Sequence, residues 1–280
     1  MSSMTAEIVL MWAAVSVYAL GATLYAVGLV FAKPGVTRSA TVASLSGLVP
    51  HALAIGVRWV RIGHGPYLGF YEVVSSMAFV SVAVLAALAL RHRSLARLGV
   101  LVMPLAFLLI GGAMFAPKSE LEITAKLASW WLTVHVAFAK LSYGAFTASF
   151  ALALLYLLRE RRKAGRFAEF AVKLPPQAVV DDLSFKFAAA GFLFLGMMIA
   201  AGAIWANEAW GRYWNWDPIE TWSLVAWVVY AVYLHLRLTM GWTGRKAAWV
   251  AVAALPVVLF ALIGVPLVYD SIHGAYLQGY

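Results

Sequence analysis

Cysteine is absent from this 280-residue chain, and charged residues make up only 12% of it. Without cysteine the chain forms no disulfide, offers no thiolate to a metal and carries no CxxCH motif of the kind that attaches haem covalently. The low charge excludes a water-soluble domain of this length, because a water-facing surface needs many more charged side chains. Any metal or cofactor must therefore be held by histidine, methionine, carboxylate or aromatic side chains of a membrane protein.

Long apolar runs make up most of the chain, which is 64% hydrophobic with a mean hydropathy of +0.85. A helix needs about twenty apolar residues to cross the hydrocarbon core. Eight segments qualify, at residues 7–31, 40–60, 69–90, 98–116, 131–158, 184–206, 219–240 and 247–267. We therefore predict an all-α membrane bundle of about eight transmembrane helices, forming one domain over residues 1–280.

Two stretches of the chain need a separate interpretation. The first apolar run has no basic n-region and no cleavage site, so we predict a spanning helix and not a removed signal peptide. Residues 167–183 are too polar, and too interrupted by Pro175 and Pro176, to span. We predict a cytoplasmic connector with a short amphipathic piece there.

The formal net charge of +9 would suggest an anionic partner in a soluble protein, but here it indicates topology. Loops rich in Lys and Arg stay on the cytoplasmic side. One set of alternate loops holds Lys33, Arg38, Arg91, Arg93, Arg97, Arg159, Arg161, Arg162, Lys163, Arg166, Arg245 and Lys246. The opposite set holds Arg58, Arg61, Lys118, Lys126 and Arg212. Both termini are therefore predicted to face outward.

An outer loop then carries the segment WANEAWGRYWNWDPIETW, residues 205–222, in which five tryptophans and a tyrosine alternate with Asn, Glu and Asp. Such rings either anchor a membrane edge or hold a large, flat, partly charged ligand such as a porphyrin. Asp217 followed by Pro218 also fits the cap and first position of a helix.

Two histidines are predicted at the same depth as this segment. His135 lies near the outer end of the fifth span, and His273 lies just beyond the eighth. Two neutral imidazoles from different helices can bind one iron axially. Zinc fits less well, because its sites usually need three or four protein ligands and no HxxxH or HExxH spacing occurs. Hydrogen bonding at the interface is the alternative role.

The other ionisable groups leave alternatives open. His51 and His235 lie inside predicted spans, where polar groups either bond to a neighbouring helix or form a functional site. His64 is predicted to serve turn packing, with a direct ligand role as the alternative, and His92 to lie in a solvated cytoplasmic loop. Lys140, inside an apolar run, either snorkels to the surface or pairs with a carboxylate or a ligand propionate.

Four segments resemble one family. ANEAWGRYWNWDPIETWSLVAWVVYAVYLH resembles the tryptophan-rich signature of the CcsA (ResC) proteins of the system II cytochrome c assembly pathway, which form a haem-handling superfamily with CcmC and CcmF. The segments RWVRIGHGPYLGFYEVVSSMAF, WWLTVHVAFAKLSYGAF and GVPLVYDSIHGAY resemble other parts of that family. Val73 stands where the family usually has Ser, and the approach to His273 lacks the family's Gly-rich pattern. The resemblance covers residues 45–276.

The resemblance implies a set of haem-binding residues. Haem b would be bound non-covalently, with its iron on His135 and His273 at an outer site. Trp210, Trp214, Trp216 and Asp217 would cradle the macrocycle. His235 would bind iron at an inner site, whose second ligand is either His51 or a histidine of a partner. No residue is implied as a catalytic acid, base or nucleophile.

The resemblance also implies a function in the cytoplasmic (inner) membrane with the active face in the periplasm. The chain would be the haem-handling part of a system II cytochrome c synthase, or haem lyase. It would act with the membrane protein CcsB (ResB) to bring haem to the CxxCH motif of apocytochrome c. Thiol-reducing partners and the lipid bilayer complete the implied partners, and nucleic acid is not among them.

Two other functions remain open from the sequence. A CcmC-like protein would deliver haem to a haem chaperone, although such proteins usually have six spans. An unrelated membrane transporter would use the tryptophan-rich loop as a gate and the histidines for proton coupling.

Overall fold

The computed structural model describes residues 2–31, 33–91, 93–116, 118, 124, 126–161 and 175–272. Within these ranges the chain forms helices and no strand. Eight helical segments are long and apolar enough to cross a membrane: Ser3–Val30, Gly35–Ile62, Gly69–Arg91, Arg93–Phe115, Trp130–Glu160, Gln177–Trp210, Pro218–Leu238 and Gly244–Val268. The predicted all-α membrane bundle is confirmed.

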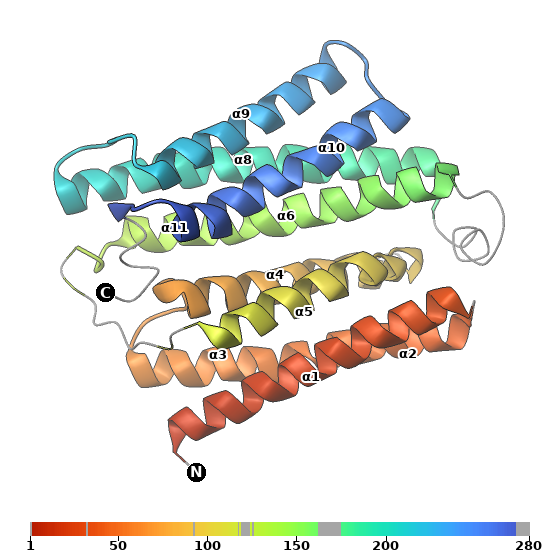
Figure 1. Cartoon of the computed structure of the whole chain (residues 1–280), viewed down its shortest axis with the longest axis horizontal. Helices are drawn as coiled ribbons and strands as arrows, with labels where there is room; N and C mark the ends of the chain where they lie inside the picture. Colours follow the sequence, from red (N-terminus) through yellow and green to blue (C-terminus); the bar gives the residue numbers. More distant parts are fainter. Residues whose placement is uncertain are drawn as a thin grey trace.

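The helices pass back and forth and form two halves (Figure 1). The first half consists of α1 (Ser3–Val30), α2 (Pro34–Ser46), α3 (Leu48–Ile62), α4 (Gly69–Arg91), the 3₁₀ segment η1 (Arg93–Leu98) and α5 (Gly99–Phe115). The second half consists of α6 (Trp130–Arg161), α8 (Gln177–Trp210), α9 (Pro218–Leu238), α10 (Gly244–Leu259), the π-helical η2 (Phe260–Gly264) and α11 (Val265–Val268).

Because successive passes alternate in direction, the loops gather at two ends of the bundle (Figure 1). Residues 63–68, 211–217 and 269–272 lie at one end, which we call the tryptophan end; the start of α1 lies there too. Residues 31, 33 and 239–243 lie at the opposite end, which we call the basic end.

Two large apolar clusters form the core, one mostly in each half, and the first also includes Leu152 of α6 and Val180 of α8. Tyr18, Tyr25 and Met103 are fully buried in the core of the first half. In the second half Phe146 stacks on Tyr230, with ring centroids 3.7 Å apart. A smaller apolar cluster at the tryptophan end joins the halves and consists of Leu68, Leu127, Leu132, Trp205 and Ala209.

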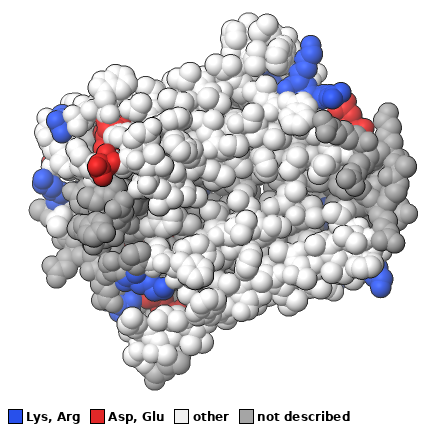
Figure 2. Space-filling model, viewed as in Figure 1, with Lys and Arg blue, Asp and Glu red and all other residues white. Residues whose placement is uncertain are grey.

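The surface in Figure 2 matches a protein that crosses a bilayer. In this view the coloured acidic and basic side chains lie towards the two ends, and an uncharged band separates them. Charge is costly in the hydrocarbon core, so it is placed where the helices leave the membrane.

The second predicted span is confirmed as the segment Gly35–Ile62, but this segment is not one regular helix. Instead of one helix over 40–60, the chain forms α2 and α3, with a break at Gly47. Pro50 has no N–H to donate to the carbonyl of Ser46, so regular helix bonding stops there. The ring of Tyr18 packs on the break, since a Cβ at Gly47 would lie 2.6 Å from its Cε1.

The connector predicted over 167–183 is wrong at its C-terminal side. Helix α8 begins at Gln177, directly after Pro175 and Pro176, whereas residues 162–174 lie outside the described part of the chain. The polar character of this stretch has a structural use. The carboxylate of Asp181 accepts two hydrogen bonds from Arg237 Nη1, at 3.0 and 2.8 Å, and one from Gly244 N at 3.2 Å. These bonds hold α8, α9 and α10 together at the basic end.

Candidate functional site

A cavity of about 150 Å³ opens at the tryptophan end, between α4 of the first half and α6, α8, α9 and η2 of the second. Its lining is mostly apolar and aromatic, with few polar groups, which is the usual character of a site for a small molecule or cofactor. The lining residues are Tyr67, Leu68, Val73, Met77, Leu127, Leu132, His135, Val136, Ala139, Tyr143, Met198, Ile199, Gly202, Ala203, Trp205, Tyr213, Trp214, Ile219, Glu220, Ser223, Ala261 and Leu262.

His135 is the histidine of this cavity, and α8 fixes its ring. Its Nδ1 lies 2.8 Å from the backbone carbonyl oxygen of Met198. Because a carbonyl only accepts, Nδ1 carries the proton of the neutral imidazole and Nε2 carries the lone pair. A metal-binding histidine usually has this arrangement, in which the second ring nitrogen donates to a carbonyl or carboxylate.

Gly202 allows the ring of His135 to reach α8. A Cβ at this position would lie 2.5 Å from Nδ1 and 2.9 Å from Cε1 of His135. Both distances are well inside van der Waals contact, so any larger residue would push the imidazole away from the Met198 carbonyl. Sequence reasoning missed both Gly202 and Met198, because a backbone carbonyl and a space left by a missing side chain give no pattern in the sequence.

Trp205 forms the wall beside His135. It is buried, its ring centroid lies 6.3 Å from that of His135, and its Nε1 donates to the carbonyl of Lys126 at 2.9 Å. Trp210 packs against Trp205 edge to face, with centroids 4.9 Å apart. Trp210 is therefore one layer behind the cavity lining, and Trp205, which was not among the predicted binding residues, is in it.

The loop 211–217 closes this side of the cavity. Gly211 ends α8 in the left-handed region, with φ of +75°, which glycine adopts without strain. Trp216 also has a positive φ, +55°, which is costly for a residue with a Cβ. Trp214 lines the cavity, whereas Trp216 is 69% exposed and lies against the edge of Trp214. The strained Trp216 is thus the outward tryptophan of the pair, and Trp214 is the inward one.

The Asp217 carboxylate accepts hydrogen bonds from backbone N–H groups and does not line the cavity. Its Oδ1 accepts from Ile219 N at 3.0 Å and caps α9, while Glu220 Oε2 accepts from Asp217 N at 3.2 Å in a capping box. Its Oδ2 accepts from Ile272 N at 2.8 Å. Asp217 therefore ties the tryptophan-rich loop to the residue that precedes His273 in the chain. His273 itself lies outside the described residues.

The remaining predicted haem ligand lies far from the cavity. His235 is exposed on α9, three residues before the helix ends at the basic end. His51 is fully buried in α3, where its Nδ1 lies 3.2 Å from the hydroxyl of Tyr18 and its ring meets the edge of Phe79. The structure thus places His51 in the core of the first half and His235 on the surface of the second.

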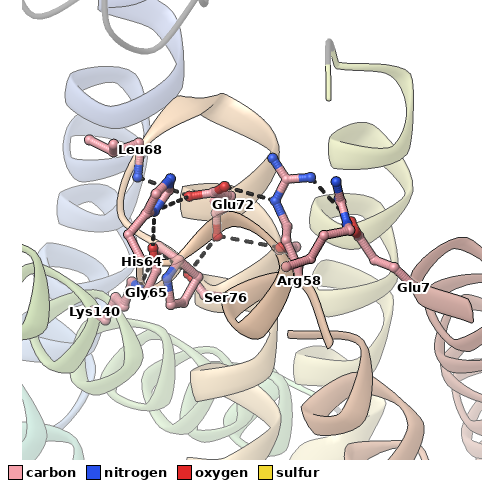
Figure 3. Close-up of polar contacts among 11 residues, drawn as sticks. Glu7, Arg58, His64, Gly65, Leu68, Glu72, Ser76 and Lys140 are labelled. Carbon is pink, nitrogen blue, oxygen red and sulfur yellow. Dashed lines mark hydrogen bonds and ion pairs between the residues drawn. The ribbon is translucent and has the colours of Figure 1, made fainter. Parts of the chain in front are cut away.

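A buried ionic network borders the cavity on the other side (Figure 3). Arg58 bridges two carboxylates, with Nε 2.7 Å from Glu72 Oε1 and Nη1 3.3 Å from Glu7 Oε1. Arg61 Nη2 lies 2.5 Å from Glu7 Oε2. His64 Nδ1 lies 2.8 Å from the carbonyl of Gly65 and 3.8 Å from Glu72 Oε2. The network joins α1, α3 and α4.

The network also fixes the loop 63–68, which is a wall of the cavity. Glu72 Oε2 accepts from Leu68 N at 3.0 Å, and Lys140 Nζ donates to the carbonyl of Pro66 at 2.6 Å (Figure 3). Tyr67 and Leu68 of this loop line the cavity. Burial, and then the carboxylate of Glu72, raise the pKa of the Tyr67 phenol, so it remains a neutral hydrogen-bond donor.

Residues 67–273 match the cytochrome C assembly protein family. The chain is 36% identical over 230 residues to the cytochrome c biogenesis protein CcsA of Chlamydomonas reinhardtii, covering 79% of this chain and 64% of that protein. It is 36% identical over 245 residues to CcsA of Parasynechococcus marenigrum (strain WH8102), covering 78% of this chain and 79% of that one.

The fold is shared with a solved structure. The cytochrome c haem lyase CcmF superposes with a TM-score of 0.71 over 100% of this chain, at 16% sequence identity. This chain spans about half of the CcmF chain, 49% of its length.

An aromatic cavity at one end of an eight-span helical bundle, together with these matches, defines a membrane protein of cytochrome c assembly. The chain belongs to the cytochrome C assembly protein family and, within it, to the CcsA proteins of cytochrome c biogenesis. The resemblance inferred from the sequence motifs is confirmed.

Proposed function

We propose that this protein binds haem b non-covalently at the tryptophan end and presents it for covalent attachment to the CxxCH motif of apocytochrome c. The observation that carries the proposal is the geometry of His135. Its Nδ1 donates to the Met198 carbonyl at 2.8 Å, so Nε2 carries a lone pair in a cavity lined by aromatic rings. A neutral imidazole held in this way is a usual ligand of haem iron.

The residues of the cavity fit a flat apolar ring. Trp205, Trp214 and Tyr213 offer aromatic faces, and polar groups are few. The cavity volume of about 150 Å³ is below the roughly 300–1,000 Å³ of typical ligand pockets. We therefore expect the loop 211–217 to shift outward on binding, with the ring edge extending towards it. His273 would supply the second iron ligand at this site.

The division of chemistry follows from the absence of cysteine. Bound haem supplies its vinyl groups, to which the two cysteine thiols of CxxCH add to form thioether bonds. The thiols come from the apocytochrome, since this chain has none. The chain's own residues bind and orient: His135 and His273 hold the iron, and the tryptophans hold the ring. In this sense the protein is the haem-handling part of a cytochrome c haem lyase.

The tryptophan end would face the periplasm and the basic end the cytoplasm, in the inner membrane. His235 would be one iron ligand of an inner site on the path of haem. Its exposed position on α9, away from the buried His51, favours a histidine of the membrane partner CcsB as the second ligand.

The absorption spectrum of the purified full chain tests haem binding. We expect a Soret band after haem-replete expression, and its loss in a His135→Ala, His273→Ala double variant. A His92→Ala variant, changed at a position distant in sequence from both, should keep the band. Absence of haem from the wild-type protein, expressed both alone and with CcsB, would refute the proposal and favour an unrelated transporter.

Covalent attachment separates this function from haem delivery to a chaperone. The chain would be co-expressed with CcsB and a CxxCH reporter, and covalent haem on the reporter would be measured. We expect attachment that requires CcsB and no haem chaperone. Attachment that required a haem chaperone would instead indicate a CcmC-like delivery protein, a class for which eight spans are unusual.

A further inference from the structure

The buried network at the tryptophan end has more positive than negative charge. Among the described residues it contains three cations, Arg58, Arg61 and Lys140, and two carboxylates, Glu7 and Glu72, a surplus of one positive charge when all are ionised. The guanidinium groups of Arg58 and Arg61 already pair with both carboxylates, and Figure 3 shows Arg58 between Glu7 and Glu72. The surplus therefore lies on Lys140, whose hydrogen bond is to the neutral carbonyl of Pro66.

Lys140 lies beside the cavity. On α6 the lining residues include Leu132, His135, Val136, Ala139 and Tyr143, which share one face of the helix. Residue 140 follows Ala139 directly and comes one turn after Val136, so it lies at the edge of that face. Its acceptor, Pro66, directly precedes two lining residues in the chain, at positions 67 and 68.

Among the described residues the hydrogen bond of the Lys140 ammonium is to a carbonyl, and Glu72 acts on its charge without a direct ion pair, so this partly buried group is a costly arrangement inside a membrane protein. Ionisable groups at such depth usually pair with an opposite charge or serve a site. Lys140 has a flexible stem and three donors, so it can bind an anion in the cavity and keep its bond to Pro66.

We propose that Lys140 binds a carboxylate of the ligand in this cavity, which for haem is a propionate. The inference rests on the proposed function, because it assigns the charged edge of the same ligand. A charge-assisted pair at Lys140 would orient that edge towards the loop 63–68. The opposite edge of the ring, which carries the vinyl groups, would then face away from the network.

The experiment compares haem with haem dimethyl ester, which lacks both carboxylates, as ligands of the purified full chain in detergent. Affinities would be measured by titration at the Soret band for the wild type and for Lys140→Gln, whose amide can still donate to the Pro66 carbonyl. Lys140→Arg keeps the charge. Lys118→Gln is the matched control, because Lys118 also lies at the tryptophan end and donates to a carbonyl, that of Met114, at 2.8 Å.

We expect Lys140→Gln to weaken haem binding by about tenfold or more and to change ester binding by less than about twofold. Lys140→Arg and Lys118→Gln should both remain within about threefold of the wild type. The wild type alone should prefer haem over the ester by about tenfold or more, which tests the proposal even if a variant does not fold.

Two results have different meanings. If the wild type bound neither haem nor the ester, the proposed function would fail. If it bound haem but showed no preference over the ester, or if Lys140→Gln weakened both ligands equally, the carboxylate contact would be refuted and haem binding would stand. In the second case Lys140 would act only through the loop 63–68.

Discussion

Replacing Gly202 by Ala tests the geometry of His135 most directly. The new Cβ would lie 2.5 Å from His135 Nδ1, while ordinary contact begins at 3.4 Å, so the ring must move by the difference, about 0.9 Å. That movement breaks the 2.8 Å hydrogen bond to the Met198 carbonyl and redirects Nε2. Loss of such a partner costs a metal site about 10–100-fold in affinity, so we expect haem binding to fall by about that factor.

The assay is haem titration of the purified full chain, with thermal unfolding as a check of the fold. Alanine is favoured over glycine inside a helix by up to about 1 kcal/mol, so the variant should remain helical. Gly111→Ala is the matched control, since a Cβ there would meet nothing within 4 Å. Unchanged affinity and an unchanged spectrum in Gly202→Ala would refute the assignment of His135, held by α8, as an iron ligand.

Two further predictions concern the ends of the bundle. Asp217→Ser keeps one oxygen to cap α9 but loses the acceptor of Ile272 N. Hydrogen exchange should therefore become faster in residues 265–272 and stay unchanged in the first turn of α9. Exchange in residues 265–272 equal to that of the wild type would contradict the role of Asp217 in holding this segment. Arg237→Met removes the bidentate pair with Asp181, whose side chains are 8% and 15% exposed, and should lower the free energy of unfolding by about 1.5–3 kcal/mol. Lys186→Met, which removes a largely exposed ion pair, should leave thermal unfolding unchanged, and a similar loss in both variants would show that burial is not the cause.

The sequence predicted the spans well, and its errors were local. Apolar length is set by the thickness of the bilayer, so eight runs gave eight spanning helices. One error lies where a tertiary contact replaces local preference, and the other is a local signal that was overlooked. Asp181 suggested a polar connector, but Arg237 from a distant helix neutralises it, so α8 continues through it. Pro50 was a visible signal for the break between α2 and α3, and the predicted single span overlooked it.

The candidate site was predicted by residue type more than by geometry. Histidine and tryptophan at one depth indicated a site for a flat ligand, and His135 and Trp214 do line one cavity. Trp216 and Asp217 belong to the same motif, yet neither side chain lines the cavity. The side chain of Trp216 is largely exposed, and that of Asp217 accepts hydrogen bonds from backbone N–H groups. The direction of a side chain in a loop depends on φ and on caps, as at Trp216, and residue type alone does not specify these.

By itself the sequence determined that the chain is a membrane bundle, that the tryptophan-rich segment lies between two spans, and which family the chain belongs to. These depend on composition, on run length and on a specific motif, all of which are local. Only the tertiary structure decided that a carbonyl of α8 orients His135, that Gly202 makes room for it, and that Lys140 carries surplus charge beside the cavity. Each of these depends on atoms far apart in the chain, whose positions are set by how the helices pack.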